Sequence, residues 1–294
     1  MGTALLSDKI QQIKQDHTNG ASQIARNALD VLKFFVQTNK TKTSSDFKIE
    51  FRKVGMQLFE ARPNMAPVQN LIAQTVYKVL AQDECNPVSI RNFALSTIDK
   101  LYKQSLLAVK ESAQNAATII KDGGVIVTCS FSSTVCETFK TGKKQEKHFK
   151  VFVAESTVDA TSYGKATAQF LESIKIPATV FADSAISRYL SNSNCVLVGA
   201  DSLLCDASII NGTPTLDIAV EAKKQDKSFY SVCETTKANI SSYHGKQLDL
   251  EYGFECIPTN LITGIITEKG VLNPDKLAEI MKERAKYVAV FNPV

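Results

Sequence analysis

Apolar residues in the first ~115 positions recur at helical spacing. In one such segment Ile24, Ala28 and Leu32 share a face, and in another Ile72, Val76 and Val79 do. The pattern predicts helices over residues 20–37, 67–82 and 89–121. Residues 38–46 are polar and predict a loop between helices. No strand-like alternation interrupts this part, so we expect its apolar faces to form a helix-on-helix core.

The period changes in the second half of the chain. Short apolar runs stand at 125–128, 149–154, 178–182, 195–198 and 229–233. Helical patterns separate them at 162–175, 185–190 and 216–224. Strands that alternate with helices indicate a parallel sheet with helices on both faces, hence an α/β fold after the helical region. A further strand is expected at 261–267, a turn at 269–270 and a helix at 275–286, while the basic stretch 141–150 is interpreted as an exposed loop.

Composition narrows the class of protein. No run of 18 apolar residues is present, and the first residues turn polar too early for a secretory signal, so we expect a cytoplasmic protein with no membrane contact. Seven scattered cysteines without a CxxC pair are typical of reduced thiols, and the three histidines do not stand at zinc-ligand spacing from them. The net charge is +4, with 15 Lys+Arg against 10 Asp+Glu in residues 1–120. A surplus of this size does not indicate direct DNA binding, and we predict no metal and no cofactor.

Acidic and hydroxyl residues follow several of the predicted strands. Asp201 comes just after the run VLVGA, and Glu155 and Lys237 come after two other strands. Ser130 and Ser132 follow the first strand, where a helix is expected to begin and where an anion suits the backbone N–H groups. In parallel sheets ligands bind beyond the carboxyl ends of the strands, so these residues are candidates for one site.

The ligand that fits these groups carries hydroxyls and phosphate, because carboxylates accept from sugar hydroxyls and a lysine attracts phosphate. A sugar phosphate or a nucleotide meets that description. A dinucleotide site is disfavoured, since the chain has neither GxGxxG nor a Walker loop. An acid after a strand is also a common turn residue or helix cap, and that structural interpretation of Asp201 stays open.

These segments resemble a known family. In order, GVIVTCSFSSTV, VFVAES, ATVFADSAI, VLVGADSLL, IIN and ETTK are similar to segments of the translation initiation factor 2B alpha, beta and delta subunits. Their family also contains ribose-1,5-bisphosphate and methylthioribose-1-phosphate isomerases. The segment ARPNMAP at 61–67 resembles a family segment too, and it contains Arg62. The resemblance implies a helical domain over 1–118 and a Rossmann-like domain over 119–294 for ligand binding and dimerisation. It also implies a homodimer or higher homo-oligomer, with initiation factor 2 as a partner.

The chain departs from the isomerase pattern at three places. The isomerases carry Thr-His-Cys after the first strand, which puts Ser130 in the cysteine position and Cys129 one residue away. Neighbouring side chains of an extended strand point to opposite sides. An arginine is missing after Glu155 and a lysine after Asn211, while Arg62, Asp201 and Lys237 remain.

We therefore predict an initiation-factor-2B-like regulatory protein that binds a sugar phosphate or nucleotide without turnover. Its predicted ligand-binding residues are listed together: Arg62, Ser130, Ser132, Glu155, Asn211 and Lys237. The alternative is a sugar-phosphate aldose–ketose isomerase that uses Asp201 with Cys129 or Ser130 as catalytic residues. A third interpretation is an assembly subunit that binds no sugar phosphate.

Overall fold

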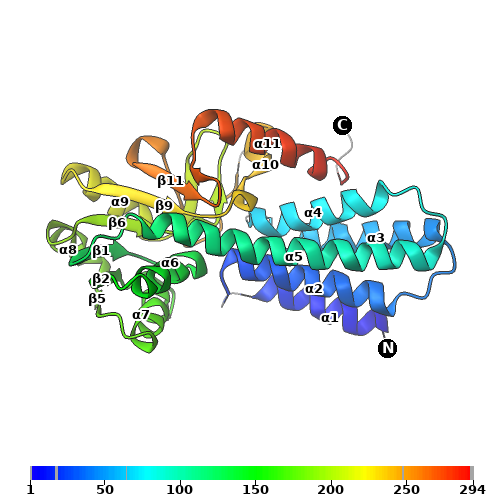
Figure 1. Ribbon diagram of the computed structural model, residues 1–294, viewed down its shortest axis with the longest axis horizontal. Helices are drawn as coiled ribbons and strands as arrows, with labels where there is room; N and C mark the ends of the chain where they lie inside the picture. Colours follow the sequence, from blue (N-terminus) through cyan, green and yellow to red (C-terminus); the bar gives the residue numbers. More distant parts are fainter. Residues whose placement is uncertain (1, 17–18, 64, 247, 292–294) are drawn as a thin grey trace.

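The computed structural model describes residues 2–16, 19–63, 65–246 and 248–291. Figure 1 shows the first five helices on one side of the molecule and the main sheet with its helices on the other. The long α5 runs from the first group to the second. The helices of the first group are α1 (Gly2–Gln15), α2 (Ala21–Thr38), α3 (Ser44–Phe59), α4 (Ala66–Leu80) and α5 (Pro87–Ala117).

Three of these helices are those expected from the hydrophobic periodicity, and the polar loop after α2 is present but shorter. Sequence analysis did not single out α1 or α3. In α3 the residues Phe47, Phe51 and Leu58 are fully buried, and Thr43 caps its first turn by accepting from the N–H of Asp46. Charged residues stand between these buried positions in the sequence, so the helical spacing of the apolar residues is less evident there.

Seven strands form the main sheet in the order β12-β11-β9-β6-β1-β2-β5. All neighbouring pairs are parallel except β11 with β12. Leaving out β12, the order by position along the chain is the 3-2-1-4-5-6 arrangement of doubly wound dinucleotide-binding folds. The strands are β1 (Gly124–Thr128), β2 (Phe149–Ala154), β5 (Ala178–Phe181), β6 (Cys195–Val198), β9 (Ser228–Val232), β11 (Gly264–Thr267) and β12 (Gly270–Val271).

Two smaller sheets lie outside the main one. A three-stranded sheet joins β10 (Phe254–Ile257), β8 (Ile209–Gly212) and β7 (Ser202–Leu203). A hairpin joins β3 (Thr157–Val158) and β4 (Thr161–Ser162). The short strand pairs had no separate signal in the hydrophobic pattern.

Both faces of the central strands are buried, which explains their continuous apolar runs. Ile126 of β1 packs with Phe139 of α6 (Ser133–Lys144), whereas its neighbour Val127 packs on the opposite face in the core that also holds Ile218 of α9 (Thr215–Lys224). That second core is continuous with the core of the N-terminal helices. The remaining helices are α7 (Tyr163–Ser173), α8 (Ile186–Ser191), α10 (Ile240–Tyr243) and α11 (Pro274–Val288), with the short 3-10 turns η1 (Asp183–Ala185), η2 (Thr235–Lys237) and η3 (Thr259–Leu261).

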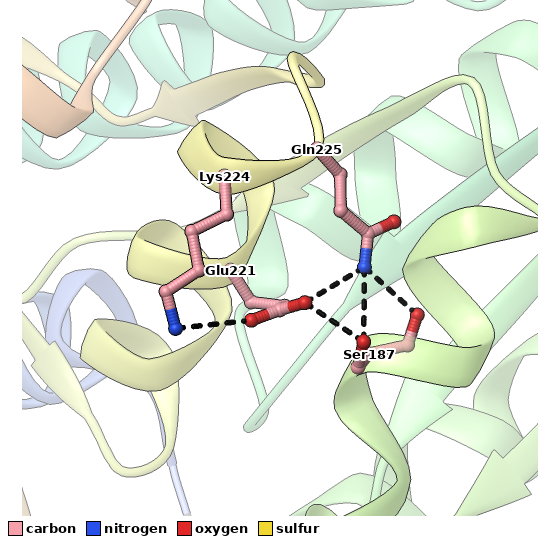
Figure 2. A network of polar contacts seen from close by, with 4 residues as sticks. All are labelled: Ser187, Glu221, Lys224 and Gln225. Carbon is pink, nitrogen blue, oxygen red and sulfur yellow. Dashed lines mark hydrogen bonds and ion pairs between the residues drawn. The ribbon is translucent and has the colours of Figure 1, made fainter.

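A surface network ties α8 to α9 (Figure 2). Glu221 accepts hydrogen bonds from the hydroxyl of Ser187 and the amide of Gln225, both at 2.8 Å, and pairs with Lys224 at 3.4 Å. The hydrogen bonds from Gln225 and Ser187 lower the pKa of Glu221. This polar cluster links two helices to each other.

The fold confirms the predicted helical region followed by a Rossmann-like parallel sheet. One local prediction was wrong: the basic stretch 141–150 is not a loop throughout, because α6 continues to Lys144 and Gly142 is buried between Ile120 and Phe149. Lysines at the end of a helix interact favourably with its dipole, so their charge did not signal a loop. The helix α5 ends at Ala117 and β1 begins at Gly124, and the domain boundary at 118/119 stays a prediction.

Candidate functional site

A pocket of about 440 Å³ lies beyond the carboxyl ends of β1 and β6. Ser130 and Phe131, which follow β1, form part of its wall, and Asp201, which follows β6, forms another. Between β1 and β6 the order of the sheet reverses direction, and this reversal is where open α/β sheets bind their ligands. The position of the pocket therefore follows from the topology.

The other walls come from distant parts of the chain. The connection between α1 and α2 contributes Asp16, Asn19 and Gly20, and the connection between α3 and α4 contributes Arg62 and Met65. The remaining lining residues belong to the β3–β4 hairpin and its surroundings, to the end of β8 and to the start of β10: Val158, Asp159, Thr161, Tyr163, Gly212, Thr213, Glu251, Tyr252, Gly253 and Phe254. The pocket is thus formed jointly by the helical region and the sheet.

Asp201 is held by its backbone, whose N–H donates to the carbonyl of Ile210 at 2.7 Å. Burial raises the pKa of its carboxyl, while Lys237 and Arg62 oppose the rise and Glu251 adds to it. A carboxyl group with a raised pKa suits proton transfer near neutral pH better than an ordinary aspartate does. Asp201 therefore has the position and the environment of an acid–base group.

Arg62 places a cation in the wall of the pocket. Its side chain is only 5% exposed, and Nη1 donates to the backbone carbonyls of Lys14 and Asp16, each at 3.1 Å. These bonds fix the guanidinium and connect α1 to the segment before α4. A fixed arginine is suited to binding phosphate or carboxylate groups.

Ser130 and Cys129 lie in different environments although they are neighbours. Ser130 lines the pocket, has a left-handed backbone (φ 58°), and donates its N–H to the hydroxyl of Ser156 at 2.7 Å. Cys129 is 2% exposed and does not line the pocket, and its Sγ lies 3.1 Å from Oγ1 of Thr215. Burial raises the pKa of Cys129 to about 12. At neutral pH this thiol is therefore protonated and poorly suited to proton transfer.

The space around Ser130 depends on Gly212. A Cβ built on Gly212 would lie 3.0 Å from the hydroxyl oxygen of Ser130, which is a tight contact. The hydroxyl of Ser130 and a larger residue at 212 therefore compete for the same space. Gly212 occupies the position at which the isomerase pattern has a lysine.

Four other predicted site residues lie outside the pocket lining. Ser132 caps α6 and accepts from the N–H of Val135 at 3.4 Å, and Glu155 forms an ion pair with Lys165 at 3.2 Å. Asn211 donates from Nδ2 to Oγ1 of Thr215 at 2.9 Å. Lys237 is buried and donates from Nζ to the carbonyl of Ala200, so its charge acts on Asp201 from behind the pocket wall.

Sequence analysis missed several residues that line the pocket, above all Asp16, Asp159, Glu251 and Tyr252. They lie in connecting segments, where no hydrophobic period marks them. Only the spatial arrangement of the helical region against the sheet brings them to Asp201. Among the described residues no cluster of three or more His, Cys, Asp or Glu side chains is arranged to hold a metal ion. Within the same ranges, no helix has the length and apolar character that a membrane crossing requires.

Comparison with known proteins gives relatives of two kinds. The chain is 27% identical to a ribose 1,5-bisphosphate isomerase of Pyrococcus furiosus, over 93% of this chain and 92% of that protein. It is also 27% identical to a putative translation initiation factor eIF-2B subunit 2-like protein of Pyrococcus abyssi, over 92% of this chain and 99% of that protein. Among solved structures, translation initiation factor eIF-2B of Pyrococcus horikoshii OT3 superposes with a TM-score of 0.80 at 25% identity, covering 92% of this chain and 98% of the other.

The model of the initiation factor 2 subunit family matches residues 17–251. This range includes the helical region from α2 onward, all the strands up to β9, and most of the pocket-lining residues. The match and the two kinds of relatives agree with the resemblance seen in the sequence motifs, and the chain belongs to the initiation factor 2 subunit family.

Proposed function

We propose that the pocket between the ends of β1 and β6 binds a phosphorylated sugar. The observation that carries the proposal is the meeting of Asp201, Ser130 and Arg62 at the switch point of the sheet. The carboxylate can accept hydrogen bonds from sugar hydroxyls, and the serine hydroxyl can donate or accept a hydrogen bond. The guanidinium attracts the negatively charged phosphate. A volume of about 440 Å³ lies within the range of small-molecule sites.

A second candidate function is aldose–ketose isomerisation of the bound sugar. The similarity to a ribose 1,5-bisphosphate isomerase supports it more directly than any comparison supports a regulatory role. The raised pKa of Asp201 favours it too, because this carboxylate could take a proton from the carbon beside the carbonyl and return it to the carbonyl carbon, while the hydroxyl proton on the first carbon passes to the carbonyl oxygen. The buried Cys129 takes no part in this scheme.

Binding without turnover, in an initiation-factor-2B-like regulatory protein, is the competing outcome. The serine at the pocket in place of a thiol supports it, since a serine hydroxyl is a poor proton donor at neutral pH. The family membership supports assembly as a homodimer or larger homo-oligomer and contact with initiation factor 2 in the cytoplasm.

The deciding experiment is calorimetric titration of the purified protein with ribose 5-phosphate, ribose 1,5-bisphosphate and AMP, followed by product analysis of each mixture. We expect saturable binding of at least one of these compounds, weakened tenfold or more by Asp201→Asn, because a hydrogen bond to a charged group is worth about 1.5–3 kcal/mol. A ketose product that disappears in Asp201→Asn identifies an isomerase. Binding without product identifies a sensor or regulatory protein, and no binding of any compound refutes the proposal.

A further inference from the structure

Ser130 has a backbone conformation that serine does not favour. Its φ of 58° lies in the left-handed region, which is unfavourable for residues other than glycine. The thiol of the preceding Cys129 contacts Thr215, whereas Ser130 lines the pocket. Its hydroxyl lies against Gly212, since a Cβ built on that glycine would be 3.0 Å from the hydroxyl oxygen. An unfavourable conformation persists only where surrounding contacts hold it, so these contacts decide where the hydroxyl lies.

Two hydroxyl groups bind the backbone N–H and the backbone carbonyl of Ser130. The N–H of Ser130 donates to Oγ of Ser156 at 2.7 Å, and its carbonyl accepts from Oγ1 of Thr167 at 2.6 Å. Both Ser156 and Thr167 are buried, and neither of them lines the pocket. Their hydroxyls therefore fix the peptide groups on both sides of the Ser130 Cα, and they act on the pocket through that residue.

The hydroxyl of Ser156 is itself oriented by its neighbours. It donates its one hydrogen to the carbonyl of Ala154 at 3.1 Å, which leaves its lone pairs for the N–H of Ser130. The N–H of Ser156 donates to Oδ1 of Asp183 at 2.9 Å. Asp183 follows β5, Ser156 follows β2 and Ser130 follows β1, so this chain of hydrogen bonds crosses the ends of three adjacent strands. Thr167 reaches the same serine from α7.

We propose that Ser156 and Thr167 are positioning residues, which hold Ser130 in the left-handed conformation that brings its hydroxyl to the pocket. The inference rests on the proposed function, in which this hydroxyl contacts the bound sugar. A hydroxyl that is already fixed binds a ligand without the entropic cost of being ordered. Loss of either positioning hydroxyl therefore lowers the affinity although no atom that touches the ligand is removed.

Two substitutions of Thr167 separate positioning from packing. Thr167→Val removes the hydroxyl and keeps the shape of the side chain, whereas Thr167→Ser keeps the hydroxyl and removes a methyl group. The ligand is whichever of ribose 5-phosphate, ribose 1,5-bisphosphate and AMP the wild type binds most tightly by calorimetry. We expect Thr167→Val to weaken its binding about threefold to fivefold, the equivalent of up to one hydrogen bond. Thr167→Ser should stay within about twofold of the wild type. Its midpoint of urea unfolding should still fall, because the lost methyl group leaves space in a buried position.

A control and a double variant make this result specific to Ser130. Thr75→Val changes another buried helical threonine, whose Oγ1 donates to the carbonyl of Leu71 at 2.7 Å, and it should bind the ligand as the wild type does. Adding Thr167→Val to Ser130→Ala should weaken binding no further, because the positioned hydroxyl is already absent. Similar dissociation constants for Thr167→Val and Thr167→Ser, or losses that multiply in the double variant, overturn the inference and leave the proposed function standing. Binding of no compound by the wild type refutes both.

Hydrogen exchange tests the contribution of Ser156 without any ligand. Ser156→Ala removes the acceptor of the Ser130 amide, so this amide should exchange about fivefold faster than in the wild type. Ser193→Ala is the matched control, since Ser193 is also buried and donates from Oγ to the carbonyl of Leu190 at 2.9 Å. It should leave exchange at Ser130 unchanged. A Ser130 amide that exchanges at the wild-type rate in Ser156→Ala overturns the inference.

Discussion

An acidic residue follows each of the strands β6 and β9, but the two carboxyl groups have different roles. Asp201 follows β6 and faces the pocket, whereas Glu234 follows β9 and is 1% exposed. Glu234 accepts from the hydroxyls of Ser22 at 2.6 Å and Thr134 at 2.5 Å, which belong to α2 and α6. An acid at the end of a strand therefore becomes a ligand-facing group or an internal tie according to which helices cover that end.

The buried tie and the pocket are linked through α2. Ser22 lies two residues beyond Gly20, which forms part of the pocket wall. Gly20 lies close to α6, since a Cβ built on it would be 3.6 Å from the hydroxyl oxygen of Ser133. One turn further along α2 lies the buried Arg26. Burial lowers the pKa of its guanidinium, and the negative charge of Glu234 opposes that decrease. Glu234 thus fixes the start of α2 against the sheet and, with it, one wall of the pocket.

The largest effect that distinguishes these strand ends is expected from Glu234→Ala. The change leaves two buried hydroxyls without their acceptor and removes one of the negative charges that act on the buried Arg26, while Asp30 remains. Leaving a buried hydrogen-bonding group without its partner costs about 1–3 kcal/mol, so with two hydroxyls affected we expect the free energy of unfolding to fall by about 2–6 kcal/mol. Urea unfolding followed by circular dichroism measures it.

Glu155→Ala is the matched control, since Glu155 also follows a strand but pairs with Lys165 near the surface. Exposed ion pairs contribute about 0.2–1 kcal/mol, and the loss in this variant should stay within that range. Similar losses in the two variants would show that the buried tie at β9 is no stronger than the surface pair.

The second prediction concerns Asp201 and pH. Because burial raises its pKa in the folded protein above the ordinary 3.8, the folded state holds this proton more tightly than the unfolded state does. The free energy of unfolding of the wild type relative to Asp201→Asn should therefore be highest at acidic pH and fall as the pH rises through the folded pKa. Paired urea titrations from mildly acidic to neutral pH give this difference, and a difference that grows with pH would contradict the raised pKa.

The sequence could predict the sheet because its strands are buried on both faces and read as apolar runs. It could also place Asp201 at the edge where ligands bind, since the end of its strand follows from the local pattern and parallel strands end at the same edge of a sheet. It could not show that Glu234 is covered by α2 or that Asp159 and Glu251 approach Asp201, because these contacts join segments far apart in the chain. Nor could the sequence show that Lys237 is buried and bonded to the backbone and does not line the pocket.

The smallest predicted effects come from substitutions of Cys129 and Ser130. They test which of these two neighbouring side chains contributes to ligand binding in the pocket. Cys129→Ala should lower the free energy of unfolding by about 1 kcal/mol through loss of packing and of the contact with Thr215. It should leave the dissociation constant of the sugar phosphate that binds the wild type within about twofold of its original value, because its thiol does not line the pocket. Ser130→Ala should do the reverse and weaken that binding about fivefold, the equivalent of one lost hydrogen bond.

Thiol labelling provides a check that does not depend on any ligand. Ellman's reagent should modify Cys85, Cys205 and Cys256, which are exposed, and reach the four buried cysteines only after denaturation. A native Cys129 that reacts as fast as the exposed cysteines would mean that its thiol reaches solvent and ionises. The isomerase chemistry that pairs Cys129 with Asp201 would then regain its support, since a thiol that ionises at neutral pH can exchange protons with a substrate.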